Sequence, residues 1–153
     1  MTRSQWIAIV AAAVACFGLI DSAYLTIKHL QGSYIRCGGE CSAVLGSKYA
    51  EGVAGIPLAG FGAMAYFTVL VAALLAARGS AAGRLLLTII APAMALISVW
   101  LVFLQAFVIH SFCKYCLASA AASFTLAGLI LIDRLGRGAR AQSVDPSAKL
   151  QLP

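Results

Sequence analysis

Long apolar segments separated by short polar stretches dominate the chain. Four of them are long enough to cross a bilayer as helices, which takes about 20 mostly apolar residues: residues 6–30, 56–77, 85–109 and 112–132. Segments that cross a bilayer must satisfy their own backbone hydrogen bonds, and this run of apolar segments suits helices rather than a barrel. The pattern therefore predicts an all-α membrane protein, a four-transmembrane-helix bundle at residues 1–135 with a polar tail at residues 136–153.

The connection between the first two apolar segments is polar and long. Residues 31–55 are rich in glycine and contain Cys37 and Cys41. Loops longer than about 12–15 residues tend to be functional. Within this loop, residues 42–49 carry apolar side chains at helical spacing, which predicts a short amphipathic helix over the mouth of the bundle.

Composition supports a membrane location, since 62% of the residues are hydrophobic and 10% are charged, against roughly 45–50% and about 25% in soluble domains. The net charge of +6 suits nucleic acid, but the basic residues are distributed as in a membrane protein. One side of the predicted bundle carries Arg3, Arg78, Arg84, Arg134, Arg137, Arg140 and Lys149, and the other carries Lys28, Arg36, Lys48 and Lys114. The positive-inside rule then places both termini in the cytoplasm and the cysteine-bearing loop in an oxidising, extracytoplasmic compartment.

The first apolar segment leaves two questions. Arg3 followed by an apolar run resembles a signal peptide, but the run continues past Cys16, which favours a retained helix with Cys16 as a buried, inert thiol.

Asp21 lies well inside the segment, and such acids usually face a bundle interior. Neighbouring hydroxyl groups can satisfy Asp21 structurally, or Asp21 can have a functional role; the sequence favours neither.

The strongest chemical signal is the C-x-x-C motif formed by Cys113-Lys114-Tyr115-Cys116 at the start of the last segment. At a helix start, sulfurs at positions i and i+3 share one face and lie within reach of each other. The helix dipole and Lys114 are expected to lower the pKa of Cys113. Cys116 lies one turn deeper, so we expect Cys113 to be accessible to water and Cys116 to face an apolar pocket.

Cys37 and Cys41 form a second pair. Their spacing allows a disulfide, and Gly38 and Gly39 give the loop conformational freedom. Cys41 could then attack a disulfide at Cys113, because electrons pass between cysteine pairs only through a mixed disulfide. Two alternatives stay open: a tetrathiolate zinc site formed by both pairs, or two structural disulfides that staple the loop.

The order of these features resembles the vitamin K epoxide reductase family. The loop pair is followed by Ser47 and then by Phe-Cys-x-x-Cys at the last segment, with supporting stretches at residues 21–26, 44–50 and 55–58. The resemblance covers about residues 6–135. It implies a four-helix bundle that encloses a quinone of the ubiquinone, menaquinone or vitamin K type.

The resemblance also implies roles for individual side chains. Cys116 would react with the quinone and Cys113 would exchange with Cys41. Cys37 would take electrons from a thioredoxin-like partner. Ser47, together with Leu45, would contact the quinone.

In bacterial members of the family the role is to reoxidise a periplasmic dithiol oxidase of the DsbA type. The resemblance therefore implies a multi-pass protein of the bacterial inner membrane with its cysteines in the periplasm. Because no thioredoxin-like domain follows the last segment, the partner is expected in trans. The chain has no asparagine and has Ala120 where vertebrate members have a tyrosine, so the quinone contacts of those side chains are not implied here.

Two other functions are compatible with the sequence. The first is reduction of vitamin K epoxide or quinone within the same fold. The second is a non-catalytic membrane scaffold or small transporter subunit, with Asp21 and Gln105 lining a path.

Overall fold

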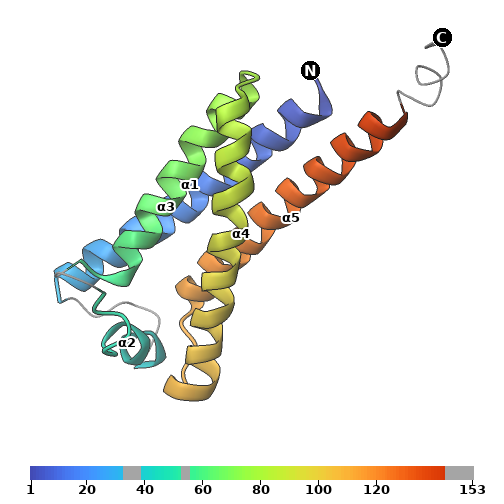
Figure 1. Cartoon of the computed structure of the whole chain (residues 1–153). Helices are drawn as coiled ribbons and strands as arrows, with labels where there is room; N and C mark the ends of the chain where they lie inside the picture. The colour runs from blue at the N-terminus through green and yellow to red at the C-terminus, as the bar shows by residue number, and fades with distance from the viewer. Residues whose placement is uncertain (33–38, 53–55, 144–153) are drawn as a thin grey trace, which may run out of the picture.

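The computed structural model describes residues 1–32, 39–52 and 56–143, and in this part of the chain the regular elements are helical (Figure 1). They are α1 (Arg3–Leu30), α2 (Gly39–Leu45), α3 (Leu58–Ala77), α4 (Ala81–Leu104), a π-helical turn η1 (Gln105–Ile109) and α5 (Lys114–Ser143). Four stretches are long and apolar enough to span a membrane: α1, α3, α4 with η1, and Lys114–Ala139 of α5. This confirms the prediction of a four-helix membrane bundle.

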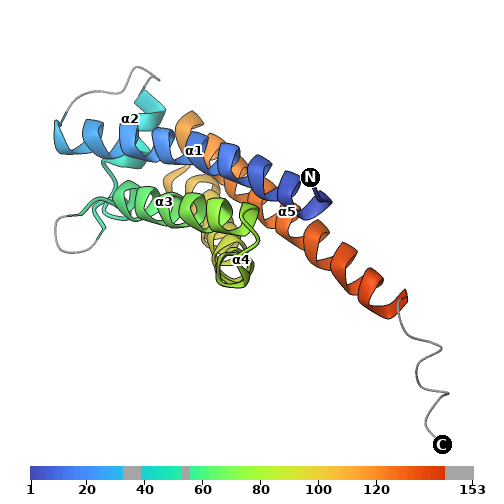
Figure 2. The ribbon, with the colours of Figure 1, turned by 90° about the horizontal axis from the view of Figure 1, so that it is seen from above.

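The four long helices form a closed arrangement. α1 packs against α3 and α5, and α4 also packs against α3 and α5. Viewed from above, α1 and α3 run side by side with α4 next to α3 (Figure 2). The short helix α2 lies at one end of the bundle and contacts η1, as the amphipathic pattern of the loop predicts.

Small side chains allow the helices to approach closely. The buried core contains many alanines, among them Ala11, Ala15, Ala72, Ala73 and Ala91, all with no exposed surface. Large apolar side chains instead lie on the outside, for example Ile20, Leu96, Trp100, Phe107 and Leu131. Helices in lipid associate through close packing of small residues rather than through burial of large ones, so this inverted pattern fits a bilayer environment.

One contact between α1 and α3 is especially tight. A Cβ atom at Gly18 would lie 2.3 Å from Cε1 of Tyr66, so the Tyr66 ring occupies the space that a side chain would need. The hydroxyl of Tyr66 reaches α5, where it donates to the carbonyl oxygen of Ser119 and lies 2.8 Å from Oγ of Ser123. Gly18 and Tyr66 therefore join three helices at the centre of the bundle.

We expect Gly18→Ala to destabilise the protein, since the added methyl must displace a fully buried ring; overpacking of this kind typically costs about 1–3 kcal/mol. Gly128→Ala in α5 is the matched control, because a Cβ there meets nothing within 4 Å and removing a helical glycine is stabilising by roughly 0.5–1 kcal/mol. Thermal unfolding in detergent should show a lower midpoint for Gly18→Ala only. Equal midpoints for both variants would contradict the packing described here.

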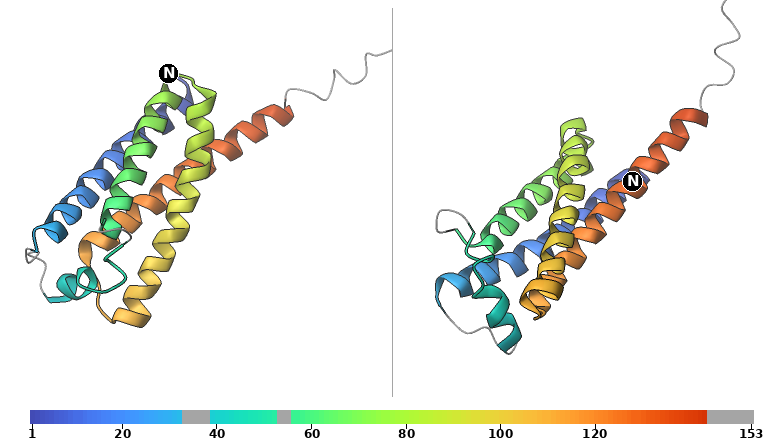
Figure 3. Two further views of the ribbon diagram at one scale, coloured as in Figure 1. Left: turned by 60° about the vertical axis from the view of Figure 1, so that its left-hand side comes forward. Right: turned by 60° about the horizontal axis from the view of Figure 1, so that its bottom comes forward.

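Three sequence expectations require correction. α5 continues to Ser143 rather than ending near residue 132, so the first part of the predicted polar tail at residues 136–153 is helical; an ion pair of 2.8 Å between Asp133 and Arg137 supports the added turns. This part of α5 extends past the other helices (Figure 3). Cys16 is exposed on the outer face of α1 rather than buried, since the inner face is taken by glycine and alanine. Finally, α2 begins at Gly39 and ends at Leu45, where the predicted helix covers residues 42–49.

Candidate functional site: a thiol cluster beside an apolar cavity

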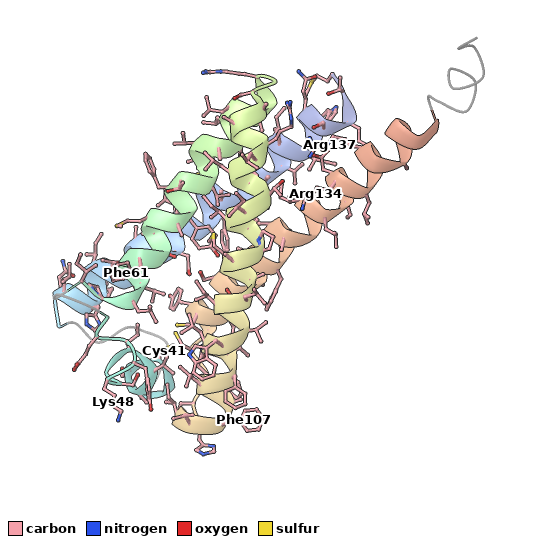
Figure 4. The ribbon with its side chains drawn as sticks, in the orientation of Figure 1. Cys41, Lys48, Phe61, Phe107, Arg134 and Arg137 are labelled. Atoms are coloured by element: carbon pink, nitrogen blue, oxygen red, sulfur yellow. The ribbon has the colours of Figure 1, made fainter. Side chains whose placement is uncertain are left out.

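α2 brings Cys41 to the C-x-x-C motif at the end of the bundle where α5 begins (Figure 4). Cys41, Val44 and Cys113 form a buried cluster, and the two cysteines have 0% exposure. Ile109, Tyr115 and Cys116 pack against it. The structure therefore joins one cysteine of the loop pair to the motif, while Cys37 lies outside the described residues.

The cysteines differ in redox state. Cys41 is disulfide-bonded, whereas Cys113 and Cys116 carry free thiols. A disulfide-bonded cysteine is not a thiolate ligand, and the described residues contain no group of three or more side chains suited to hold a metal. The zinc alternative gains no support from this arrangement. A motif with two free thiols is likewise not acting as a structural staple.

Cys113 has an acidic thiol. Its pKa is lowered to about 7, first because the Cys116 thiol donates a hydrogen bond to it and further because the backbone N–H groups of Cys116 and Tyr115 point toward it, against the opposing effect of burial. The predicted lowering of the Cys113 pKa is thus confirmed. The neighbouring thiol and the helix start cause it; Lys114 is exposed and does not contribute.

The sequence predicted that Cys113 would be accessible to water, and this prediction is wrong. Cys113 is fully buried, because α2 covers it with Cys41 and Val44. The sequence predicted a helix of the loop at the mouth of the bundle, but not that this helix would cover the start of α5. Among the described residues, Cys41 is the cysteine of the loop that packs against Cys113.

An apolar cavity of about 130 Å³ opens beside the cluster. This is roughly ten times the space that a single water needs. Cys116 lines the cavity together with Leu45, Ser47 and Ala120, whereas Cys41 and Cys113 do not. The hydroxyl of Ser47 donates to the carbonyl oxygen of Val44 at 2.7 Å, which ties the segment after α2 to its last turn. Cys116 thus faces an apolar pocket, as predicted.

Gln105 connects the cavity wall to the motif. It is 3% exposed, lines the cavity, and accepts a hydrogen bond of 2.9 Å from the backbone N–H of Cys113 to its Oε1. The π-helical turn that begins at Gln105 ends at Ile109 and is followed by His110, whose backbone is left-handed (φ 54°); such turns often occur at functional sites. A glutamine inside an apolar segment was the only sequence signal for this contact, and it was not assigned to the site.

Asp21 lies close to the site but does not line the cavity. It is 9% exposed, and its Oδ2 has no hydrogen-bond partner among the described residues. The neighbouring Thr26 hydroxyl donates to the carbonyl oxygen of Ser22 at 2.7 Å rather than to the acid. A tilted contact between the rings of Tyr24 and Tyr115, with centroids 5.5 Å apart, places this stretch of α1 against the first turn of α5. The negative charge of Asp21 tends to raise the pKa of Cys113.

The fold and site together define a class: a multi-pass helical membrane protein with a cysteine pair at the wall of an apolar cavity. Comparison with protein families makes this specific, because residues 9–131 match the vitamin K epoxide reductase family. The match covers most of the chain, and the protein belongs to this family. A comparison with individually curated proteins gives no match. Membership supports an oxidoreductase function of the membrane disulfide and quinone kind.

Proposed function

We propose that the protein oxidises a thioredoxin-like partner of the DsbA type and passes the electrons to a membrane quinone, which supports disulfide formation outside the cytoplasm. The observation that carries this proposal is that the two cysteines of the motif have different surroundings. Cys116 lines the apolar cavity, and Cys113 packs against the disulfide-bonded Cys41. One sulfur can therefore meet an apolar oxidant while the other meets a protein relay.

The cavity fits a quinone head group in chemistry as well as in size. Its walls are mostly apolar, from Leu25 to Ile109, with a few polar groups among them, as is usual for small-molecule sites. Leu45 and Ser47 come from the segment that closes the cavity, and Cys116 comes from α5. We propose these three as quinone contacts, with the quinone supplied by the bilayer as an acceptor of two electrons and two protons.

The reaction begins from the reduced motif. Cys113, whose pKa of about 7 makes the thiolate accessible, and Cys116 close a disulfide as two electrons pass from the sulfurs to the quinone in the cavity. One of the two protons required comes from the Cys116 thiol and the other from water. Burial of Cys113 protects the thiolate from other oxidants during this step.

Exchange through the loop pair restores the motif. In the proposed relay, the dithiol of the partner reduces the disulfide between Cys37 and Cys41 through a mixed disulfide at Cys37, and the partner leaves oxidised. Cys41 then attacks Cys113, which releases Cys116 as a thiol, and Cys37 attacks Cys41 to release Cys113. Each step exchanges one S–S bond for another, so electrons and protons balance.

The charge distribution supports a topology in which this end faces the periplasm of a bacterial inner membrane. Lys48 lies at the cysteine-bearing end of the bundle, whereas Arg134 and Arg137 lie on α5 toward the opposite end (Figure 4). The basic residues at the second end suit a cytoplasmic surface. We propose that both termini are cytoplasmic.

The direct test is quinone reduction by purified protein in the presence of a reduced DsbA-type protein. We expect the absorbance of the quinone to fall while disulfides accumulate in the partner at an equal molar rate. Vitamin K epoxide offered as sole acceptor distinguishes the epoxide reductase alternative by its product. A rate no greater than that of the protein with fully alkylated cysteines would reject the proposal.

A further inference from the structure

The side-chain amide of Gln105 has one defined orientation. The backbone N–H of Cys113 can only donate, so the Gln105 atom at 2.9 Å from it must be the oxygen Oε1. The amide nitrogen Nε2 then points elsewhere. It carries two N–H groups and makes no hydrogen bond with the described residues, although Gln105 is 3% exposed.

This free donor belongs to the cavity wall. Gln105 lines the same cavity as Cys116, and its Nε2 is not among the fully buried atoms that lack a partner. An amide donor on a residue that lines an apolar cavity is costly to leave unpaired, and an acceptor on a ligand would satisfy it.

Two hydroxyl groups of the wall already make hydrogen bonds. The Ser47 hydroxyl donates to Val44, and the Ser119 hydroxyl donates to the Tyr66 hydroxyl at 3.2 Å. Ser98 also lines the cavity, but it precedes Gln105 by two helical turns and so lies deeper in the bundle. Gln105 is the lining residue that is hydrogen-bonded to the motif itself.

We propose that Gln105 recognises the oxidised form of the quinone by donating an Nε2 hydrogen bond to one of its carbonyl oxygens, while Oε1 holds the backbone of Cys113. This inference rests on the proposed function and assigns the polar contact that orients the acceptor beside Cys116. A quinone carbonyl is a pure acceptor and matches an N–H group. A quinol hydroxyl is a weaker acceptor and brings a hydrogen that itself needs a partner.

The consequence is discrimination between substrate and product. The cavity should bind quinone more tightly than the corresponding quinol, so that the reduced product leaves. Gln105 is also a positioning residue for Cys113, because the same amide joins the ligand to the N-terminus of α5. The two functions use different atoms and can be separated by mutation.

The test measures equilibrium binding of 2-methyl-1,4-naphthoquinone and a short-chain ubiquinone, each in the quinone and quinol forms, to purified protein without oxygen. Cys113 and Cys116 are replaced by serine in all samples so that no turnover occurs. Gln105→Met removes both hydrogen bonds. Gln105→Glu is measured across a pH series, because burial raises the pKa of a carboxyl group; once ionised, it retains an acceptor for Cys113 and lacks the donor. Ser98→Ala removes a hydroxyl from the same wall as the matched control.

We expect both Gln105 variants to bind quinone roughly 5- to 30-fold more weakly, as the loss of one hydrogen bond to a ligand implies, and to lose the preference for quinone over quinol. Ser98→Ala should retain that preference. In protein with its native cysteines, the alkylation rate of Cys113 should change in Gln105→Met, which loses the hydrogen bond to the backbone of Cys113, but stay near the wild-type rate in Ser98→Ala. Unchanged preference in both Gln105 variants would overturn the inference alone, whereas failure of the parent protein to bind any quinone would reject the proposed function as well.

Discussion

Replacing Cys116 with serine is expected to reduce quinone reduction to the uncatalysed background. A serine hydroxyl does not ionise near neutral pH and cannot form the second half of a disulfide, so electrons have no route from the relay to the cavity. Cys113→Ser should have the same effect on turnover, since the motif then lacks its contact with Cys41. The measurement is steady-state quinone reduction with a reduced DsbA-type partner.

Cys16→Ser is the matched control for these variants, because Cys16 is a free thiol on the outer face of α1, away from the cluster. It should retain wild-type turnover. Trapping gives an independent measurement: when Cys41→Ser is incubated with the oxidised partner, Cys37 should attack the disulfide of the partner, and the mixed disulfide should accumulate because no Cys41 thiol releases it. It is visible as a larger species on a non-reducing gel. Normal turnover in either Cys113→Ser or Cys116→Ser would exclude the motif as the redox centre.

The reactivity of Cys113 should rise through neutral pH. Only the thiolate is nucleophilic, so alkylation is slow below the pKa and reaches a plateau above it, with a midpoint near pH 7. In Cys116→Ala the hydrogen bond from the neighbouring thiol is lost, and the midpoint should move up toward the ordinary cysteine value of about 8.5. At neutral pH this corresponds to a roughly tenfold lower alkylation rate.

The chain offers a clean readout for this experiment. Trypsin cleaves after Lys114, so Cys113 and Cys116 fall on separate peptides and mass spectrometry can follow each one. Cys116→Ser serves as the control, because its hydroxyl retains a hydrogen-bond donor and should keep the midpoint lower than alanine does. Identical midpoints for the native, serine and alanine proteins would show that Cys116 does not set the acidity of Cys113.

The covering of the motif by α2 has a mechanistic consequence. A thiolate at the outer end of a membrane helix would ordinarily be open to any oxidant in its compartment. Here Cys113 is enclosed by Cys41 and Val44 on one side and joined to Gln105 on the other. Under the proposed function, specificity for one protein relay and one apolar acceptor would follow from this packing, with no need for selective chemistry at sulfur.

Much of the architecture follows from local sequence properties. Four apolar segments of sufficient length require four helices in a bilayer, because no other unclosed structure satisfies the backbone there. The two cysteine pairs, together with Ser47, indicated the family that the comparison of residues 9–131 confirms. The acidity of Cys113 was also predictable, since its position at a helix start exposes it to unpaired N–H groups.

Only the tertiary structure decided which residues far apart in the chain contact each other. Burial of Cys113 depends on α2. Cys116 faces a cavity built from all four long helices. Gln105 reaches Cys113 only because a π-helical turn and the left-handed His110 redirect the chain between them. Sequence periodicity describes which face of one helix is apolar, but not which neighbour covers it or where packing leaves a space. The sequence by itself therefore determined the helices and the two cysteine pairs, and the packing determined that Cys113 contacts Cys41 and that Cys116 lines the cavity.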